Sequence, residues 1–390
     1  MTLPRRQFLS TIVSVVGAAV APHRVQAQTR STINVKSVGA AGDGKLSDLE
    51  HVRAAIAMAA ERRDGATVFF PPGEYFLGTA DDAYLLSLTK MRNIRFVGEQ
   101  ATLSCRSVRG QSSMLVLAGC HNVTVEGLAF RDYGLNREIN WLGAAAIRLT
   151  NEGATGCEKI EIKNCTFESV LSAVVCRTFD TAARSRHLVL QNLSVTRSYY
   201  GFSFQDSCDD VVGRRLRCDN VKRSYFPFGV SNHDIELETI NNTTGFTDVL
   251  IKCYHKDTSG LKVKVKCRGK RSGDAIVALD QQHEKGQGLI RNISLDLDVD
   301  DADCRLNTVV LIRSFDPKAR VERETANRWD DIAINGDVRI CDNTKLIEIV
   351  TLSKTPGTLH IGARLAGHPR LPARFPGFTV TASRESAGQR

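Results

Sequence analysis

Apolar and polar residues alternate in short runs along the chain, and one such run recurs between residues 93 and 340. Each copy reads apolar–x–apolar, continues through one or two polar or small residues, and leads into a second apolar run. This period of two is typical of β-strands and differs from helical spacing. The nine copies begin at Asn93, Asn122, Lys159, His187, Asp210, Asp234, Leu261, Asn292 and Asp331. Their mean step is about 30 residues, a repeat length typical of solenoids.

A step of this length that carries three short strands predicts one coil of a parallel β-helix. Each coil leaves a backbone edge unpaired, and the next coil, stacked about 4.8 Å away, supplies the missing hydrogen bonds. A two-sheet sandwich is the alternative, but sandwich turns come about every 8–12 residues without a longer repeat. We therefore expect an all-β solenoid of about nine to ten coils.

The N-terminal segment predicts export. Arg5-Arg6-Gln7-Phe8-Leu9 is a twin-arginine signature, a short apolar stretch covers residues 11–21, and small residues precede residue 28. We therefore expect residues 1–27 to be a twin-arginine signal peptide and the protein to be periplasmic or secreted.

Both ends of a solenoid need covers. Residues 48–62 predict a capping α-helix with an acidic start, because Val52, Ala55, Ile56 and Ala59 fall on one face. We expect a single domain over residues 28–366 that includes this cap. The Pro-rich residues 367–390 are expected to form a C-terminal tail.

Composition and charge narrow the class of protein. The chain is 42% hydrophobic, which excludes wholesale disorder. Its body lacks an apolar run of about 18 residues, which excludes a polytopic membrane protein and indicates no membrane association after signal removal. The net charge is +9, and it is +6 without residues 1–27, which carry three arginines and no acids. For an exported basic protein, an acidic polysaccharide is a more natural partner than nucleic acid. The expected state is a monomer or a homotrimer.

Cysteine and acidic residues give little sign of a metal site. The 11 cysteines contain no C-x-x-C pair, so zinc is disfavoured and buried free thiols are expected. A disulfide between Cys120 and Cys157 stays open. No cofactor is predicted with certainty. Ca²⁺ is possible, although the acidic residues are not densely clustered.

Two N-terminal motifs resemble a known family. Residues 39–44 read Gly-Ala-Ala-Gly-Asp-Gly, and residues 69–75 read Phe-Phe-Pro-Pro-Gly-Glu-Tyr. They resemble the opening of the pectate-lyase-like superfamily, which is related to polygalacturonases and phage tailspikes. The chain departs from that family at residues 47–50, where Ser-Asp-Leu-Glu replaces an Asp-Asp-Thr type segment. The resemblance implies a right-handed parallel β-helix, but the superfamily holds lyases, hydrolases, epimerases and adhesive tailspikes.

The resemblance also implies an active groove along the sheet whose strands precede the repeated copies. The strands selected in this way span residues 140–149, 171–176, 199–204, 225–230, 248–251, 274–279 and 307–312. Residues at equivalent places in adjacent coils are expected to stack one rung apart.

The first candidate ladder is aromatic and basic. Residues 196–200 and 222–226 have similar sequences and are expected to occupy equivalent places in successive coils. Aromatic faces stack on sugar rings and arginine forks bind carboxylates, and elimination needs a cation on the uronate carboxylate and a base at C5–H. The catalytic candidates are Arg197, Tyr199, Arg223 and Tyr225, and the substrate-binding candidates are Asp132, Tyr133, Arg137, Trp141, Tyr200 and Lys222. Solvated turn residues that repeat with the coils are the alternative.

The second candidate ladder is acidic. Asp248 and Asp274 recur at the same interval as the two segments of the first ladder, and each precedes an apolar strand. They resemble the aspartates of polygalacturonases, which act as general acid and base, and hydrolysis needs two such carboxylates. However, the family's Gly-His-Gly motif is replaced by Leu306-Asn307-Thr308, which tells against that mechanism, and turn-capping aspartates are an alternative. Lys252, His255, Asp280, His283 and Glu284 follow the same strands and are held in reserve.

These patterns predict an exported enzyme that cleaves a uronate-containing polysaccharide by β-elimination. Three alternatives stay open: a glycoside hydrolase that uses Asp248 and Asp274, a uronate epimerase, and a glycan-binding solenoid without turnover.

Overall fold

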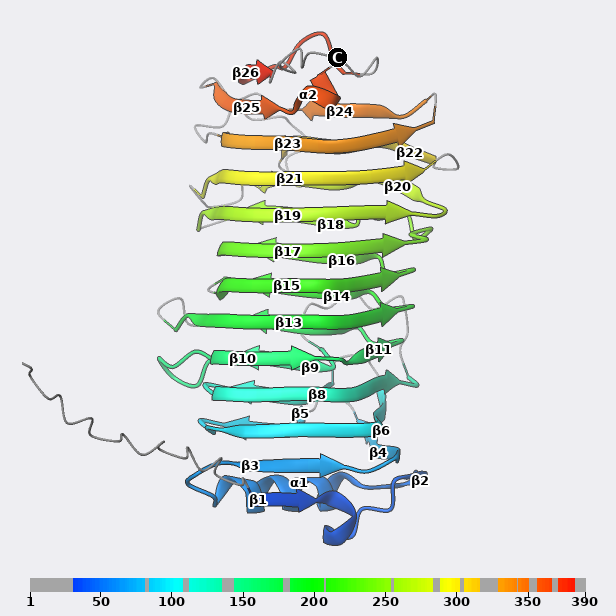
Figure 1. The fold of residues 1–390 in the computed structure, drawn as a ribbon, viewed down its shortest axis with the longest axis vertical. Helices are drawn as coiled ribbons and strands as arrows, with labels where there is room; N and C mark the ends of the chain where they lie inside the picture. The colour runs from blue at the N-terminus through cyan, green and yellow to red at the C-terminus, as the bar shows by residue number, and fades with distance from the viewer. Residues whose placement is uncertain are drawn as a thin grey trace, which may run out of the picture.

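The computed structural model describes residues 31–80, 84–107, 112–134, 144–177, 183–206, 208–253, 256–282, 288–301, 305–315, 329–341, 343–350, 356–366 and 371–382. The chain is a right-handed parallel β-helix whose coils stack in sequence order along one axis (Figure 1), which confirms the predicted fold class. The predicted signal peptide lies outside the described ranges. Within those ranges, no helix has both the length and the apolar character needed to cross a membrane.

The coils build two parallel sheets of 16 and 10 strands, here named sheet A and sheet B. Sheet A contains β1 (Ser31–Asn34), β2 (Asp43–Ser47), β3 (Ala66–Phe70), β4 (Gly73–Ala80), β6 (Ile94–Ser107), β8 (His121–Asp132), β10 (Glu158–Lys163), β11 (Thr166–Glu168), β13 (Ser185–Thr196), β15 (Cys208–Asp219), β17 (Ser231–Ile240), β19 (Thr258–Arg268), β21 (Ile290–Asp301), β23 (Trp329–Ile340), β25 (Gly357–Ile361) and β26 (Phe378–Ala382). Sheet B contains β5 (Tyr84–Thr89), β7 (Ser113–Ala118), β9 (Ile147–Thr150), β12 (Ser172–Arg177), β14 (Tyr200–Gln205), β16 (Arg223–Phe228), β18 (Val249–Cys253), β20 (Ser272–Gln282), β22 (Arg305–Phe315) and β24 (Lys345–Val350).

A ladder of left-handed residues explains the sequence repeat. At the start of each sheet A strand in the repeat, one residue has φ between 52° and 66°. The ladder consists of Asn93, Asn122, Lys159, His187, Asp210, Asn232, Gly260, Asn292 and Asp331. Asn, Asp and Gly accept this conformation most readily, and side chains such as Asn122 also bond the coil below, with its Nδ2 donating to Asn93 Oδ1 at 2.6 Å. Seven of the nine predicted copies begin on this ladder, and the other two begin one or two positions after it.

Both ends of the solenoid are covered. The helix α1 (Leu49–Ala60) lies across the N-terminal end and buries the four predicted residues, with the 3₁₀-helix η1 (Val35–Val38) beside it (Figure 1). The Asp48 carboxylate ties the preceding turn to the helix, since it accepts hydrogen bonds from Ala41 N at 2.7 Å and Gly42 N at 3.0 Å. At the other end lies α2 (Ala363–Ala366), and the predicted tail contains β26, which pairs with β25.

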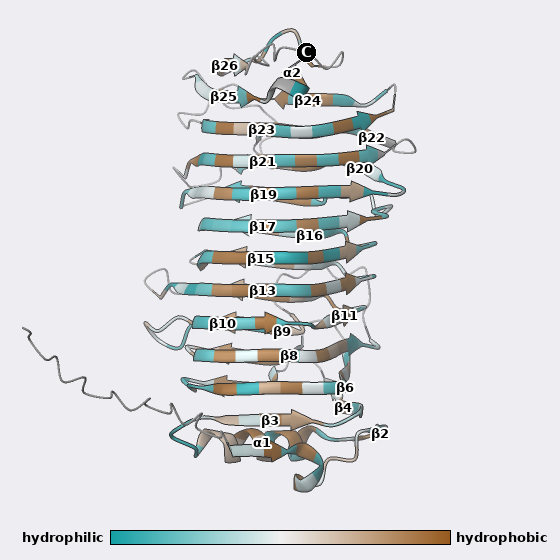
Figure 2. Ribbon diagram, in the orientation of Figure 1, coloured by the Kyte–Doolittle hydropathy of each residue, from teal (hydrophilic) through white to brown (hydrophobic). Residues whose placement is uncertain are grey.

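The interior is one continuous apolar column. Strands alternate between brown and teal along their length in Figure 2, because every second side chain points inward. Equivalent residues stack from coil to coil, as Phe130 and Phe167 do with ring centroids 5.2 Å apart. The ten cysteines in the described residues are free, so the expectation of free thiols is confirmed for them and Cys120 and Cys157 are not bridged.

Candidate functional site

The outer face of sheet B carries one row of mostly charged and polar side chains in register. All seven segments expected to line the groove contribute strands to this sheet. Neighbours of Lys252 such as Ile251 and Cys253 belong to the core, so by alternation Lys252 points outward. The row, here called the charged row, runs through Arg177, Gln205, Phe228, Lys252, Asp280 and Arg313.

Asp280 is the buried centre of the charged row. Its side chain is 3% exposed, and its Oδ2 lies 3.2 Å from an Arg313 guanidinium nitrogen and 3.8 Å from Lys252 Nζ. Its Oδ1 is buried and has no hydrogen-bond partner among the described residues. Burial lowers the pKa of Lys252 against the opposing effect of Asp280, and the charges of Arg223 and Arg313 lower that pKa further. One carboxylate is therefore shared between two cations in a poorly solvated place.

An aromatic–cation cluster lies at the start of β14 and β16, two strands that also carry Gln205 and Phe228 of the charged row. Tyr199 and Tyr200 pack with ring centroids 4.6 Å apart, and Lys222 Nζ lies 4.2 Å from the Tyr199 ring. The Arg223 guanidinium lies 5.4 Å from the Phe246 ring. Burial raises the pKa of Tyr200 to about 12, so its phenol keeps its proton at neutral pH. Burial also lowers the pKa of Arg223.

The charged row and the aromatic–cation cluster form one site. Lys252 Nζ lies 6.0 Å from the Phe226 ring, and Arg223 lies 6.0 Å from the same ring. The charges of Asp280 and Arg313 also act on Arg223. No described carboxylate lies within ion-pair distance of Arg223. The site therefore carries more positive than negative charge in partly buried surroundings, which suits an anionic ligand.

The register of sheet B corrects the predicted basic–aromatic ladder. Tyr200 is opposite Arg223 and Phe202 is opposite Tyr225, so Tyr199 and Tyr225 do not occupy equivalent places. The coil between these strands is shorter than the interval that the sequence similarity suggested. Tyr199, Tyr200, Lys222 and Arg223 do come together, and their roles stay predictions.

Arg197 is separated from that group. It occupies the turn after β13 with φ 50°, and it forms an ion pair with Glu168, which also pairs with Arg131. The equivalent turn position of the next coil is Asn220, also left-handed. The turn-residue interpretation therefore replaces the catalytic one for Arg197.

Tyr225 is wrong as a catalytic candidate. Its side chain is fully buried inside the solenoid, and its hydroxyl lies 2.7 Å from His233 Nδ1. Burial raises the pKa of this phenol well above its usual value. A polysaccharide on the outer face cannot reach it.

The two aspartates of the acidic ladder do not face each other. Val249 is opposite Val277, so Asp248 is opposite Ile276 and not Asp274. Asp248 is 2% exposed and pairs with the buried Arg271, while Asp274 is exposed and approached by Asn307 Nδ2 at 3.5 Å. Burial raises the pKa of Asp248. The predicted general acid–base pair is therefore wrong.

The remaining candidates divide between the end of β8 and undescribed segments. Asp132 is buried and caps a turn by accepting hydrogen bonds from Ser107 N and Gly134 N at 2.9 and 2.8 Å. This structural role replaces substrate binding. Tyr133 is exposed, and its hydroxyl donates to Glu74 at 2.9 Å. The substrate-binding candidates Arg137 and Trp141 lie outside the described residues, and so do the reserve residues His255 and His283. The reserve residue Glu284 does too.

Sequence reasoning held Lys252 and Asp280 only in reserve, and it missed Arg313 and Phe246. Lys252, Asp280 and Arg313 each follow an apolar strand segment directly, a shared position that could have marked them. Phe246 stands alone in a loop and carries no such pattern. Within the described residues, no group of three or more His, Cys, Asp or Glu side chains could hold a metal ion.

Comparisons with known proteins agree with the fold. Residues 32–224 match the family model described as "Rhamnogalacturonase A/epimerase, pectate lyase-like". A 65-residue segment is 43% identical to alginate lyase 7 of Azotobacter vinelandii, and it spans 17% of this chain and only 8% of that relative.

Solved structures match over most of the chain. The endo-xylogalacturonan hydrolase of Aspergillus tubingensis is similar with a TM-score of 0.55 and 13% identity, over 91% of this chain and 100% of that one. The catalytic domain of a GH87 α-1,3-glucanase is similar with a TM-score of 0.50 and 11% identity, over 93% of this chain and 70% of that one. Through residues 32–224 the chain thus matches the pectate-lyase-like superfamily, it has that superfamily's right-handed parallel β-helix fold, and it is related to carbohydrate-active enzymes with this fold.

Proposed function

We propose that the protein is an enzyme that binds a uronate-containing polysaccharide along the outer face of sheet B and cleaves it by β-elimination. The observation that carries the proposal is the crowding of Lys252 and Arg313 around the single carboxylate of Asp280, with Arg223 near them. The printed names of the relatives, an alginate lyase and an endo-xylogalacturonan hydrolase, support a polysaccharide substrate.

The proposed chemistry begins with the substrate carboxylate. Arg223 and Arg313 bind it, and neutralising its charge acidifies the proton on C5. Lys252 removes that proton in its neutral form, which burial makes accessible by lowering its pKa. The C5–H electrons form the C4–C5 double bond, the C4–O4 bond breaks, and the leaving oxygen takes a proton.

The tyrosines supply that last proton in this scheme. Tyr200 keeps its proton at neutral pH because burial raises its pKa to about 12, and it packs against Tyr199 beside Arg223. Asp280 holds Lys252 and Arg313 in position and contributes no proton.

Elimination is favoured over hydrolysis by the count of carboxylates. Both hydrolytic mechanisms need two carboxyl groups that flank the bond. Asp248 is engaged with Arg271 in the interior, and the charged row offers Asp280 alone. Epimerisation shares the proton abstraction and differs in returning a proton to the opposite face of C5.

The deciding experiment incubates the purified protein with alginate, polygalacturonate, hyaluronan and two neutral glucans. Ultraviolet absorbance of the C4–C5 double bond and reducing ends are followed together, and product NMR reports inversion at C5. Both signals rising on one uronate polymer is the expected result. Reducing ends without absorbance would overturn elimination in favour of hydrolysis. Inversion without cleavage would identify an epimerase, and binding without any product a glycan-binding solenoid.

We also propose that the protein is exported through the twin-arginine pathway. Arg5 and Arg6 and the short apolar stretch after them support the proposal. Replacing both arginines by lysine should retain the protein in the cytoplasm, as cell fractionation would show. Unchanged export of that variant would overturn the route.

A further inference from the structure

The loop between β17 and β18 presents one half-buried aromatic ring to the proposed site. Phe246 lies in this loop, and its ring centroid is 6.1 Å from that of Tyr199. Lys222 Nζ lies 5.2 Å from the Phe246 ring and the Arg223 guanidinium 5.4 Å from it. A cation over an aromatic face is attracted by about 0.5–1 kcal/mol when exposed and about 2 kcal/mol when desolvated. Phe246, which precedes β18, thus contacts two cations from the start of the preceding rung of sheet B, β16.

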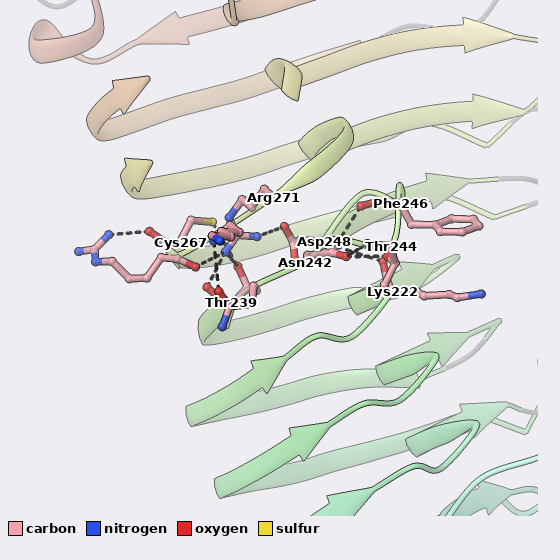
Figure 3. A network of polar contacts seen from close by, with 11 residues as sticks. Lys222, Thr239, Asn242, Thr244, Phe246, Asp248, Cys267 and Arg271 are labelled. Atoms are coloured by element: carbon pink, nitrogen blue, oxygen red, sulfur yellow. Dashed lines mark hydrogen bonds and ion pairs between the residues drawn. The ribbon is translucent and has the colours of Figure 1, made fainter. Parts of the chain in front are cut away.

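A polar network holds the Phe246 backbone in place (Figure 3). Asn242 Nδ2 donates to Phe246 O at 3.0 Å and to Asp248 Oδ1 at 3.2 Å. Thr244 returns two hydrogen bonds to Asn242 Oδ1, from its amide at 3.3 Å and from its hydroxyl at 2.6 Å. The loop therefore closes on Asn242, and the Phe246 side chain projects away from the network on the same side as Lys222.

A buried ion pair anchors this network to both sheets. Asp248 pairs with Arg271, whose side chain is 0% exposed and donates to Thr239 O at 2.6 Å and Thr239 Oγ1 at 2.9 Å in β17 of sheet A. On the sheet B side, Asp248 O accepts from Ser224 N at 2.7 Å and Tyr225 N at 3.1 Å. The loop cannot shift without breaking contacts to β16 and β17 together.

We infer that Phe246 is a specificity-determining residue, an aromatic platform that aims Lys222 and Arg223 at the carboxylate of a uronate ring, and that Asn242, Asp248 and Arg271 position it. The inference rests on the proposed function and names the part of the site that distinguishes acidic from neutral sugars. Arg223 has no carboxylate partner among the described residues, so its charge is free to meet one from the substrate. Asp248 acts here through Phe246 and not on the substrate.

The test compares one uronate polymer with its carboxyl-reduced form, which keeps the sugar and linkage but removes the charge. The ratio of kcat/KM on the two forms measures carboxylate discrimination. Phe246→Leu should lower that ratio about tenfold, mainly through a higher KM on the acidic form, since it removes the aromatic face under two cations. Phe246→Tyr should restore it. Phe76→Leu, at a half-buried position of β4 in the first coil, is the matched control and should leave it unchanged.

Asp248→Asn tests the positioning network separately. Measured well below its melting temperature, it should reduce the same ratio in the same direction as Phe246→Leu. A purely structural role would lower activity on both polymers equally and would overturn the positioning assignment.

The outcomes separate this inference from the proposed function. Suppose that the wild type cleaves a uronate polymer and that Phe246→Leu leaves the ratio of kcat/KM on the acidic and carboxyl-reduced polymers unchanged. The role of Phe246 in carboxylate discrimination is then overturned, while the proposed lyase function is not. If the wild type binds acidic polymers without turnover, the ratio of dissociation constants replaces kcat/KM. Wild-type protein that neither binds nor cleaves any uronate polymer overturns both.

Discussion

The outer faces of the two sheets hold their charges in opposite ways. On sheet A, cations and anions alternate from coil to coil and pair with each other. Arg214 pairs with Asp234 at 2.8 Å, and Arg268 pairs with Asp298 at 2.7 Å. A hollow of about 430 Å³ opens on this face, and Lys266, which lines it, pairs with Glu238 at 3.3 Å. Each of these charges therefore has a partner within the protein and a large contact with water.

Sheet B concentrates positive charge in drier surroundings. Asp280 and Lys252, whose side chains are 3% and 17% exposed, form the dry part of this face. Arg313, 34% exposed, shares the Asp280 carboxylate, and no described carboxylate lies within ion-pair distance of Arg223. Electrostatic interactions strengthen where water is excluded. A paired, solvated face such as sheet A gains little from an anionic ligand, whereas sheet B has an unmatched charge for one to neutralise.

The largest difference between the two sheets is expected when the proposed base on sheet B, Lys252, is removed. Lys252→Met should lower turnover of the uronate substrate by about 10²–10⁴-fold, the usual contribution of a general base. The pH profile should change with it. Because burial lowers the pKa of Lys252, the wild-type kcat/KM should rise with pH below the ordinary lysine value, as the amine loses its proton.

Lys264→Met on sheet A is the matched control, since Lys264 lies 3.9 Å from Asp296 with its side chain 60% exposed. It should leave turnover and its pH profile unchanged. An equal loss of turnover in Lys252→Met and Lys264→Met would contradict a catalytic role for Lys252 on sheet B.

Stability gives the second contrast, between two Arg–Asp pairs of different burial. Asp248→Asn leaves Arg271 as an uncompensated buried charge, so the free energy of unfolding should fall by about 3–5 kcal/mol. Asp298→Asn breaks a pair whose side chains are 31% and 47% exposed, and it should cost about 0.2–1 kcal/mol. Urea unfolding of both variants measures the difference, and similar losses would contradict the role of burial.

The fold was predictable because its physical cause is local. Each coil begins its sheet A strand with a left-handed residue, and Asn, Asp and Gly mark that position in the sequence at Asn93, Asn122, Asp210, Asn232, Gly260, Asn292 and Asp331. The capping helix was predictable for the same reason, since its four buried residues follow helical spacing within one segment.

The site was only partly predictable because it depends on register between coils of unequal length. In sheet B, Tyr200 is opposite Arg223, and the steps from Lys252 to Asp280 and from Asp280 to Arg313 are each longer than that one. A fixed spacing therefore aligned Tyr199 with Tyr225, one of which lies in the outer cluster and the other in the core. A one-residue slip reverses the face of a strand residue, so local sequence alone could not separate them.

The interior where the two sheets meet provides the third test. His233 in β17 contacts Tyr225 of β16, and burial lowers the pKa of His233 from 6.5 to about 4. The unfolded chain takes up this proton near pH 6.5 and the folded chain only near pH 4. The neutral His233 therefore costs the fold nothing above pH 6.5. As the pH falls from 6.5 to 4, the free energy of unfolding should decrease by roughly 3 kcal/mol at most.

His233→Gln should remove this decrease in the free energy of unfolding at acidic pH. The free energies of unfolding of the variant and the wild type are compared near neutrality and again just above pH 4. Their difference should shrink toward the acidic end, because only the wild type carries the acid penalty. A difference independent of pH would show that His233 is protonated equally in both states.

The smallest effect is expected in the sheet A hollow, where Glu238→Gln removes the partner of Lys266. Both side chains keep substantial contact with water, 48% of Lys266 and 30% of Glu238, so the loss should be about 0.2–1 kcal/mol. Raising the ionic strength to about 1 M shortens the screening length to about 3 Å, so the difference from the wild type should largely vanish. The loss in Asp248→Asn should persist under the same salt because water and ions do not reach Arg271. A salt-resistant loss in Glu238→Gln would mean that the charges of sheet A are not solvated as the comparison requires, and the contrast between the two faces would fail.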